Sequence, residues 1–246
     1  MDYYFITGTS QGLGRALVEE ALKRGGRVHG LSRSEPADID SLRKREYVHF
    51  SYDLSDLQGL EAFAAEFFKI PTEANSVILI NNAGTLGEVS HIGEWDNTDL
   101  IKAFATNLTA PAVLQNTFLK LFGEKALGKI VINISSGASK SPYDGWSAYC
   151  SGKAGLEMYS RVLAEEAKKK SKRDTRVWSV APGVVDTGMQ DRLRESDPDQ
   201  FSNLDRFLSL KEEGKLMPPS ESAAKIFMLL EHPERSSDTV QDIRNF

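Results

Sequence analysis

Short apolar runs alternate with amphipathic stretches along most of the chain. The runs 76–82 (SVILINN) and 128–135 (GKIVINIS) are almost continuous in Val, Ile and Leu, which is typical of strands buried on both faces. The same pattern predicts further strands at 3–7, 27–32, 47–53, 175–182 and 239–243. Apolar positions at helical spacing predict helices at 12–25, 54–69, 95–122, 148–170 and 220–231.

The order of these elements indicates the fold class. Repeated strand–helix units imply parallel strands joined by crossover helices. We therefore predict an α/β protein: a Rossmann-like, doubly wound, mostly parallel seven-stranded sheet with helices on both faces. No linker or low-complexity segment divides the chain, so residues 1–246 are expected to form a single domain. The polar stretch 188–216 has the composition of a mobile lid over a substrate.

Charge and composition exclude several classes of protein. A net charge of −5 argues against a nucleic-acid partner, whose binding usually needs a basic face. No apolar run approaches the ~20 residues of a membrane span, and the first residues do not have the pattern of a signal peptide. The single cysteine, Cys150, fits a reducing compartment, so we expect a cytoplasmic protein. The four histidines lack close ligand spacing, and we predict no metal site.

The first predicted strand ends in the glycine-rich turn TGTSQGLG. Small residues between a strand and a helix let the backbone approach a pyrophosphate, whose charge faces the helix N-terminus. The spacing is G-x-x-x-G-x-G rather than G-x-G-x-x-G, and the alternative is a tight turn that needs positive φ. We favour a dinucleotide site. Its candidate residues here are Gly8, Ser10, Gln11, Gly12, Leu13 and Gly14.

The end of the second predicted strand indicates which nicotinamide cofactor fits. An acidic residue about 20 positions after the glycines binds the 2′-hydroxyl of NAD, whereas arginine accommodates the 2′-phosphate of NADP. Arg33 lies 19 residues after Gly14, and Glu35 is the competing candidate. NADP(H) is therefore the expected cofactor. Arg15 either adds positive charge here or is a solvated helix residue.

Tyr149 and Lys153 are four residues apart, so a helix would place both on one face. A phenol has a pKa of about 10, and lowering it by about three units requires roughly 4 kcal/mol of preferential stabilisation of the phenolate. The Lys153 ammonium and the positive ring of an oxidised nicotinamide are two sources of such stabilisation. Tyr149 is thus a candidate proton donor in a carbonyl reduction.

Several separated motifs occur in one order: TGTSQGLG, NNAG (81–84), Asn107, Ser136 in NISSG, Tyr149-x-x-x-Lys153, and PGVVDT (182–187). With this set the chain resembles the short-chain dehydrogenase/reductase family over roughly residues 3–190. GTSQGLG, NNAGTLG, PYDGWSAYCSGKA and APGVVDTGMQ are similar to the branch of sepiapterin reductases and bacterial benzil reductases, whose members use NADPH to reduce vicinal dicarbonyls. The resemblance thins after about residue 192, where the family usually selects its substrate.

The resemblance implies an NADPH-dependent carbonyl reductase that converts a dicarbonyl, either a benzil-like diketone or a sepiapterin-like pterin, to a hydroxy ketone. Tyr149 would supply the proton and Lys153 would also bind the nicotinamide ribose. Ser136 would hydrogen-bond the substrate carbonyl, the alternative being a turn or cap hydroxyl. Asn107 would hold a water that links Lys153 to solvent, the alternative being an amide bonded within the core.

The resemblance also implies further cofactor contacts. Asp53 would contact the adenine, although it could equally cap the following helix. The remaining cofactor candidates come from NNAG and from the segment that holds the nicotinamide carboxamide, namely Asn82, Ala83, Gly84, Pro182, Gly183, Val185 and Thr187.

Three residues are candidates for the substrate pocket in addition to Ser136 and Tyr149. Trp146 would form a wall that stacks on a flat ring, or would simply pack in the core. Met189 belongs to the expected lid. Asp242 matches an acidic residue that holds the pterin ring in the sepiapterin branch, or is a solvated strand end.

Two other functions remain open. One is an NAD-dependent alcohol dehydrogenase, in which Glu35 rather than Arg33 meets the ribose. The other is a non-catalytic NADP(H)-binding sensor, against which the presence of Ser136, Tyr149 and Lys153 argues. The expected partner is a small-molecule carbonyl compound, with no nucleic acid and no membrane. The family implies a homodimer or homotetramer through the helices at 95–122 and 148–170.

Overall fold

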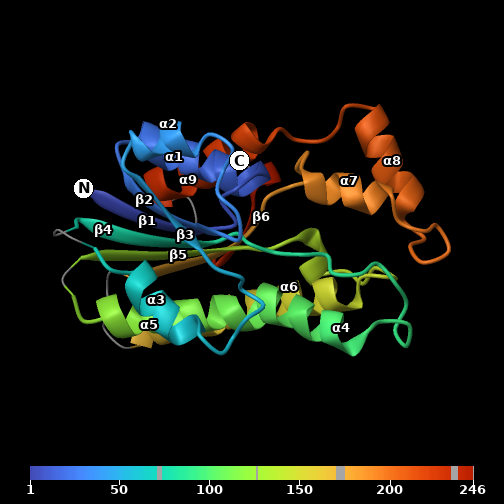
Figure 1. Ribbon diagram of the computed structural model, residues 1–246, viewed down its shortest axis with the longest axis horizontal. Helices are drawn as coiled ribbons and strands as arrows, with labels where there is room; N and C mark the ends of the chain where they lie inside the picture. Colours follow the sequence, from blue (N-terminus) through green and yellow to red (C-terminus); the bar gives the residue numbers. More distant parts are fainter. Residues whose placement is uncertain (71–73, 126, 170–174, 234–237, 246) are drawn as a thin grey trace.

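The strands form one sheet in the order β3-β2-β1-β4-β5-β6-β7 (Figure 1). The computed structural model describes residues 1–70, 74–125, 127–169, 175–233 and 238–245. Every pair of neighbouring strands in the sheet is parallel, which confirms the predicted doubly wound sheet and makes it wholly parallel. The strands are β1 (Asp2–Thr7), β2 (Arg27–Ser32), β3 (Tyr47–Ser51), β4 (Ser76–Asn81), β5 (Gly128–Ile134), β6 (Thr175–Ala181) and β7 (Val240–Asp242).

Helices cover both faces of the sheet, as the sequence predicts. Figure 1 shows α1, α2 and α9 on one face and α3, α5 and α6 on the other. Helices α7 and α8 lie beyond the sheet, near the ends of the later strands. The α-helices are α1 (Gly12–Lys23), α2 (Ile39–Arg43), α3 (Leu60–Phe67), α4 (Asn97–Phe104), α5 (Ala110–Phe122), α6 (Ser147–Lys169), α7 (Gly188–Arg194), α8 (Leu204–Glu212) and α9 (Pro219–Glu231).

The alternation of side chains along β4 explains why its sequence is apolar throughout. Ile78 and Ile80 face the layer formed by α1 and α9, whereas Val77 and Leu79 face the layer with α3 and α5. All four are at most 2% exposed. Burying such a side chain contributes about 1.5–3 kcal/mol to the stability of the fold. Each face of β4 thus stabilises the packing of the helical layer that covers it.

A buried polar cluster lies between the sheet and α5 and α6. The Asn133 Nδ2 atom donates to Gln115 Oε1 at 2.9 Å and to Ser160 Oγ at 2.8 Å. Asn133 Oδ1 accepts from the Asn81 amide at 2.8 Å. These four side chains are at most 2% exposed, so their hydrogen bonds replace those that water would make.

Some predicted helix bounds differ from those observed. The predicted helix 54–69 begins only at Leu60, because Asp53 accepts hydrogen bonds from the backbone N and Oγ of Ser55, both at 2.9 Å, in a local turn. The predicted helix 95–122 is interrupted by a π-helical turn, Ala105–Thr109, between α4 and α5. The predicted helix 148–170 is observed as Ser147–Lys169, and residue 170 lies outside the described residues.

The stretch 188–216 contains two helices that the sequence analysis did not predict. Leu193 in α7 and Leu204 and Phe207 in α8 pack with Phe201 against Trp146. This apolar cluster is separate from the two on the faces of the sheet, and it packs α7 and α8 against the start of α6. The stretch is therefore an ordered substructure with its own small core.

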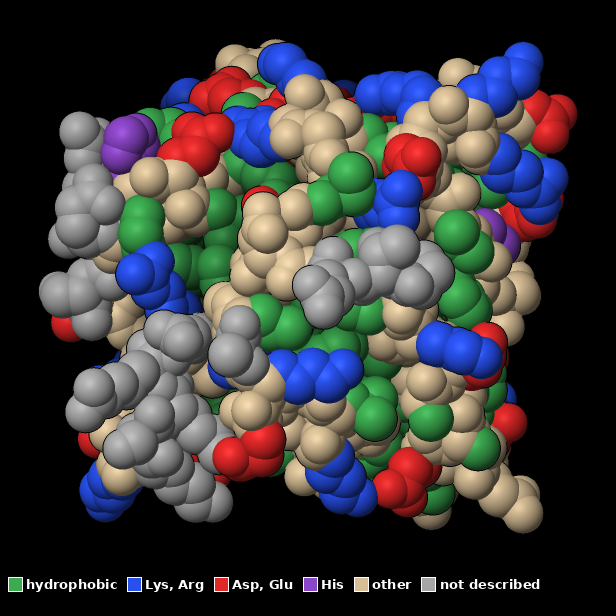
Figure 2. Space-filling view, turned by 90° about the vertical axis from the view of Figure 1, so that its left-hand side faces the viewer, with side chains coloured by type: hydrophobic (Ala, Val, Ile, Leu, Met, Phe, Trp, Pro, Cys, Tyr) green, Lys and Arg blue, Asp and Glu red, His purple; other side chains and the backbone are tan. Residues whose placement is uncertain are grey.

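The opposite end of the molecule, where the strands begin, is shown in Figure 2, and there Lys and Arg side chains are interspersed with Asp and Glu. Within the described ranges, no helix combines the length and apolarity needed to cross a membrane. Likewise, no cluster of three or more His, Cys, Asp and Glu among these residues is placed to hold a metal ion.

Candidate active site

A cavity of about 1920 Å³ lies at the carboxyl ends of the strands. Its lining runs from the loop between β1 and α1, past the ends of β2, β4, β5 and β6, to β7. Ligands of doubly wound sheets bind at this edge, where the strand order reverses, which here is between β1 and β4. The volume exceeds the roughly 300–1,000 Å³ of a typical single-ligand pocket, so the cavity has room for a dinucleotide and a second molecule.

The glycine loop forms one wall of this cavity. Gly8 and Gly12 have positive φ angles of 74° and 57°. A Cβ atom on Gly14 would lie 1.9 Å from the Gly8 carbonyl oxygen, so only glycine lets α1 start against this turn. The turn therefore needs these glycines, as the tight-turn alternative states, and it brings backbone close to the cavity. The predicted loop residues that line it are Gly8, Ser10, Gln11, Gly12, Leu13 and Gly14.

Thr7 joins the glycine loop to the NNAG segment. Its Oγ1 atom accepts hydrogen bonds from the backbone N of Asn82 at 3.0 Å and of Ala83 at 2.9 Å. The Asn82 side chain in turn donates to the Thr7 carbonyl oxygen at 2.9 Å. Asn82 therefore ties β1 to β4, and Asn82, Ala83 and Gly84 line the cavity. The sequence analysis missed the role of Thr7, for which its place before the first glycine was the available signal.

Arg33 and Glu35 both line the cavity beyond the end of β2, and they differ in their partners among the described residues. Glu35 forms an ion pair with Arg43 at 2.7 Å. Arg33 lines the cavity, and no carboxylate of the described residues lies within 4.0 Å of its guanidinium. Asp53 also lines the cavity, while its carboxylate accepts from Ser55 in the turn before α3. An unpaired cation at this place can receive a phosphate.

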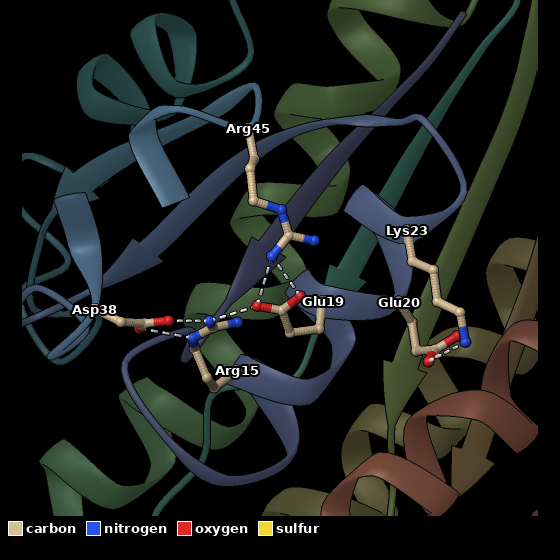
Figure 3. Close-up of polar contacts among 6 residues, drawn as sticks. All are labelled: Arg15, Glu19, Glu20, Lys23, Asp38 and Arg45. Carbon is tan, nitrogen blue, oxygen red and sulfur yellow. Dashed lines mark hydrogen bonds and ion pairs between the residues drawn. The ribbon is translucent and has the colours of Figure 1, made fainter. Parts of the chain in front are cut away.

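Arg15 is held in an ion-pair network outside this wall (Figure 3). Its guanidinium donates to Glu19 at 2.6 Å and, through Nε, to Asp38 at 3.0 Å, while Arg45 pairs with the other side of Glu19 at 2.8 Å. The hydrogen bond from Arg15 lowers the pKa of Asp38. Arg15 is not among the described residues that line the cavity. Its charge is neutralised within the network.

The three main catalytic candidates meet where β5 ends. Ser136 follows β5 directly, and Tyr149 and Lys153 lie on the first turns of α6. The Ser136 side chain is close enough to Tyr149 to lower the pKa of the phenol. The Lys153 Nζ atom donates to the Ile134 carbonyl oxygen at 2.7 Å and lies 5.8 Å from the centre of the Tyr149 ring. All three candidates line the cavity.

Burial dominates the protonation of Tyr149 and Lys153. It raises the pKa of Tyr149, and the hydrogen bond to Ser136 opposes this only in part. Burial lowers the pKa of Lys153 to about 8. We predict that Lys153 and the positive ring of an oxidised nicotinamide together lower the pKa of the phenol, and this joint effect stays a prediction. The Lys153 ammonium is itself desolvated and donates a hydrogen bond to a backbone carbonyl.

The turn that carries Ser136 is fastened to α6 by two residues that the sequence analysis missed. Ser139 Oγ lies 2.8 Å from the Ser136 carbonyl oxygen and 2.8 Å from Glu157 Oε2. Glu157 is held in turn by Arg161 at 2.9 Å. Ser136 Oγ also accepts from the Ala138 backbone N at 3.2 Å, so it caps this turn as well as facing Tyr149. The available signal was Glu157, four residues after Lys153 on the same helical face.

Asn107 lies in the π-helical turn, and its side chain is bonded within the core. Its Oδ1 accepts from the Thr85 backbone N at 2.9 Å, and its Nδ2 donates to the Thr85 carbonyl oxygen at 2.8 Å. It is fully buried and is not among the described residues that line the cavity. A Cβ atom built on Gly84 would lie within 3.4 Å of both Asn107 Oδ1 and Lys153 Nζ, so the two side chains are neighbours. A role of Asn107 in proton supply stays a prediction.

The residues after β6 form another wall of the cavity, which meets the glycine loop where Thr187 lies near Gly12. Val185 pairs with Met217 in an isolated parallel bridge, and Ser222 Oγ donates to the Pro182 carbonyl oxygen at 3.0 Å. These contacts fix the segment against α9 and against Met217, two residues before that helix. The predicted cofactor residues of this segment all line the cavity, namely Pro182, Gly183, Val185 and Thr187.

Trp146, Met189 and Asp242 line the same cavity. Trp146 stacks on Phe201 with ring centres 4.8 Å apart and meets the Tyr149 ring edge-on at 5.5 Å. It is therefore a packing residue that also lines the cavity, and its stacking on a substrate ring stays a prediction. Asp242 is paired with Arg244, a residue that the sequence analysis did not consider.

The fold and the site define an oxidoreductase of the Rossmann type with a Ser–Tyr–Lys constellation. The sequence matches the short chain dehydrogenase family over residues 3–198. The chain belongs to this family, whose members are nicotinamide-dependent oxidoreductases.

Individual relatives narrow the comparison. The benzil reductase ((S)-benzoin forming) of Bacillus cereus is 42% identical over 239 residues, which cover 95% of this chain and 96% of that protein. The sepiapterin reductase of Rattus norvegicus is 35% identical over 244 residues, covering 92% of this chain and 90% of that protein. Among solved structures, the KRED1-Pglu enzyme superimposes with a TM-score of 0.78 at 31% identity, covering 93% of this chain and 94% of that chain.

Proposed function

We propose that this protein is an NADPH-dependent carbonyl reductase that reduces one carbonyl of a dicarbonyl compound to a hydroxy ketone. The observation that carries the proposal is the meeting of Ser136, Tyr149 and Lys153 at the end of β5, inside a cavity with room for a dinucleotide and a substrate. The similarity to benzil and sepiapterin reductases supports the dicarbonyl class.

The chemistry divides between the cofactor and the chain. The nicotinamide cofactor supplies the hydride when it is bound. The Ser136 hydroxyl holds the substrate carbonyl oxygen, and the Tyr149 hydroxyl transfers its proton to that oxygen as negative charge develops. Burial keeps the Tyr149 phenol protonated at neutral pH, and the alkoxide that develops on the substrate is the stronger base, so the proton moves toward the substrate. Helices α7 and α8, which supply Met189 and Phe207 to the cavity, act as the substrate lid.

The choice of NADPH over NADH rests on the guanidinium of Arg33, which lines the cavity with no carboxylate of the described residues within 4.0 Å. Arg33→Gln is expected to raise the Kd of NADPH about tenfold while leaving that of NADH unchanged, since only NADPH carries the 2′-phosphate. Arg15→Gln is the matched control, because Arg15 is paired with Glu19 and Asp38 outside the cavity. Titration of the cofactor fluorescence measures both constants. Tighter binding of NADH than of NADPH to the wild-type protein would favour the NAD-dependent alternative.

The reductase activity is tested by the oxidation of NADPH and NADH with benzil and with sepiapterin. Tyr149→Phe is expected to lower kcat at least about 100-fold, the usual size of a lost general acid. Tyr159→Phe is the control, because Tyr159 lies on the same helix with its hydroxyl near the Ala112 carbonyl oxygen. NADPH binding without turnover of any dicarbonyl would favour a sensor, and full activity of Tyr149→Phe would refute the assigned proton donor.

We also propose that the exposed face of α4 and α6 forms the contact between copies of the chain. Ile101 is 66% exposed, Met158 is 61% exposed and Val162 is 50% exposed. Burying such large apolar side chains in a contact between two copies lowers the free energy. Met158 and Val162 are four residues apart on one face of α6. Met158→Glu is expected to shift the mass measured by light scattering toward that of a monomer. An unchanged mass would place the contact elsewhere.

A further inference from the structure

At the β7 edge of the cavity the Asp242 carboxylate is fully engaged by one neighbouring residue. Arg244 Nε donates to Asp242 Oδ1 at 2.9 Å and to Oδ2 at 3.1 Å, and Arg244 Nη2 also donates to Oδ2. The Arg244 backbone N donates to Oδ1 at 3.0 Å. Both carboxylate oxygens therefore accept hydrogen bonds from within the chain.

This ion pair lies against the segment that follows β6. Asp242 pairs with Ala181 across β6 and β7, next to the segment that begins at Pro182. A Cβ atom on Gly183 would lie 4.0 Å from Arg244 Cγ, so the arginine stem packs on the same segment. Asp242 and Arg244 line the cavity together with the aromatic side chains Tyr143, Trp146 and Phe207.

The pairing changes what this end of the cavity can recognise. A free carboxylate would bind a cation or a pair of N–H donors, such as the edge of an amidine or a guanidine. With both oxygens engaged and the charge balanced by Arg244, that recognition is lost. The Asp242 side chain is 21% exposed and that of Arg244 is 62% exposed, so the arginine lies on the solvent side of the carboxylate.

We propose that Arg244 is a specificity-determining residue, which occupies Asp242 and so makes the substrate end of the cavity select uncharged aromatic dicarbonyls. Within the function proposed above, on which this inference rests, benzil-like diketones are then the substrates. Pterin-like dicarbonyls, whose aminopyrimidine edge offers paired N–H donors, are disfavoured because Arg244 occupies the Asp242 carboxylate that would meet this edge.

The first test compares two substrates in three variants. Arg244→Gln is expected to raise the ratio of kcat/KM for sepiapterin to that for benzil at least tenfold. The double variant Arg244→Gln/Asp242→Asn is expected to lose this rise, because the freed carboxylate is its cause. Lys120→Gln removes a similarly exposed ion pair, that with Glu61, far from the cavity and serves as the control. A ratio within twofold of wild type in Arg244→Gln, or a rise that persists in the double variant, would overturn the proposal.

The second test does not depend on turnover. Benzamidine, a flat aromatic cation, and benzamide, its neutral counterpart, are titrated into the protein saturated with NADP⁺ and followed by calorimetry. Arg244→Gln is expected to bind benzamidine about tenfold more tightly than wild type, with benzamide unchanged. Equal affinity of wild type and variant for benzamidine would overturn the role of Arg244. A wild-type protein that reduces neither substrate would instead refute the proposed function, and the benzamidine result would still decide this inference.

Discussion

The substitution Lys153→Met measures how much the buried charge of Lys153 lowers the free energy of unfolding. Lys153 is 3% exposed, and its burial lowers the pKa from 10.5 to about 8. Each unit of pKa difference between the folded and unfolded states corresponds to about 1.4 kcal/mol. The charged ammonium therefore destabilises the fold by about 3 kcal/mol at pH 7. Methionine has a similar length and carries no charge that must leave water, so this cost is absent from Lys153→Met.

The expected gain is smaller than this cost and depends on pH. The variant loses the hydrogen bond from Nζ to the Ile134 carbonyl oxygen, which contributes about 1 kcal/mol. A net gain of about 2 kcal/mol in the free energy of unfolding is thus expected at pH 7. Because the folded-state pKa is the lower one, the unfolded chain binds more protons between about pH 8 and pH 10.5. The stability of the wild type therefore rises through that range, and the advantage of the variant vanishes near pH 10.

Urea unfolding followed by tryptophan fluorescence, at pH 7 and at pH 10, measures this difference without cofactor. Lys120→Met is the control, since Lys120 is 58% exposed and its loss is expected to change stability by less than about 0.5 kcal/mol. A Lys153→Met protein less stable than wild type at pH 7, or a difference equal at both pH values, would refute the reasoning. Loss of reductase turnover in the same variant would show that the destabilising charge serves the reaction.

Three further substitutions test the surroundings of the site. Gly14→Ala places a methyl group 1.9 Å from the Gly8 carbonyl oxygen, so NADPH binding measured by fluorescence should weaken at least tenfold; unchanged binding would contradict the role of the turn. Ser139→Ala frees the Ser136 turn from Glu157, and steady-state kinetics should show kcat lowered about tenfold with the KM of NADPH unchanged, whereas the reverse pattern would contradict it. Asn133→Leu leaves Gln115, Ser160 and Asn81 without their shared partner, so urea unfolding should show a loss of at least about 3 kcal/mol; a loss below about 1 kcal/mol would contradict the role of this cluster.

The fold could be predicted because the residue types of the central strands indicate that both faces of the sheet are covered. Strands β4 and β5 are aliphatic on both faces, which only a sheet covered on both sides allows. The helices α7 and α8 were missed for the opposite reason. Their buried residues are only Leu193, Leu204 and Phe207, and these lie among charged side chains. The sequence pattern of the stretch therefore predicts a polar loop.

The candidate site shows a similar division. The residues fixed by backbone geometry, such as Gly8 and Gly14, follow from the motif alone, because strand, turn and helix must meet there. Side-chain partnerships across the chain do not follow from it. The spacing of Glu157 four residues after Lys153 indicates its face of α6 but not its bond to Ser139. The spacing of Asp242 and Arg244 likewise does not distinguish their ion pair from one between ordinary surface residues.

The bond from Thr7 to the NNAG segment has a consequence for biosynthesis. The hydroxyl of residue 7 is satisfied by backbone N–H groups 75 and 76 residues further along, so the floor of the dinucleotide site closes only after β4 has joined β1. Contacts of such sequence separation form late, because a long loop must first be closed. A nascent chain that ends before β4 is therefore expected to have no affinity for dinucleotide, although it already contains every glycine of the loop. The cofactor can stabilise only chains that have assembled the first half of the sheet, which makes it a selective ligand of correctly folded molecules.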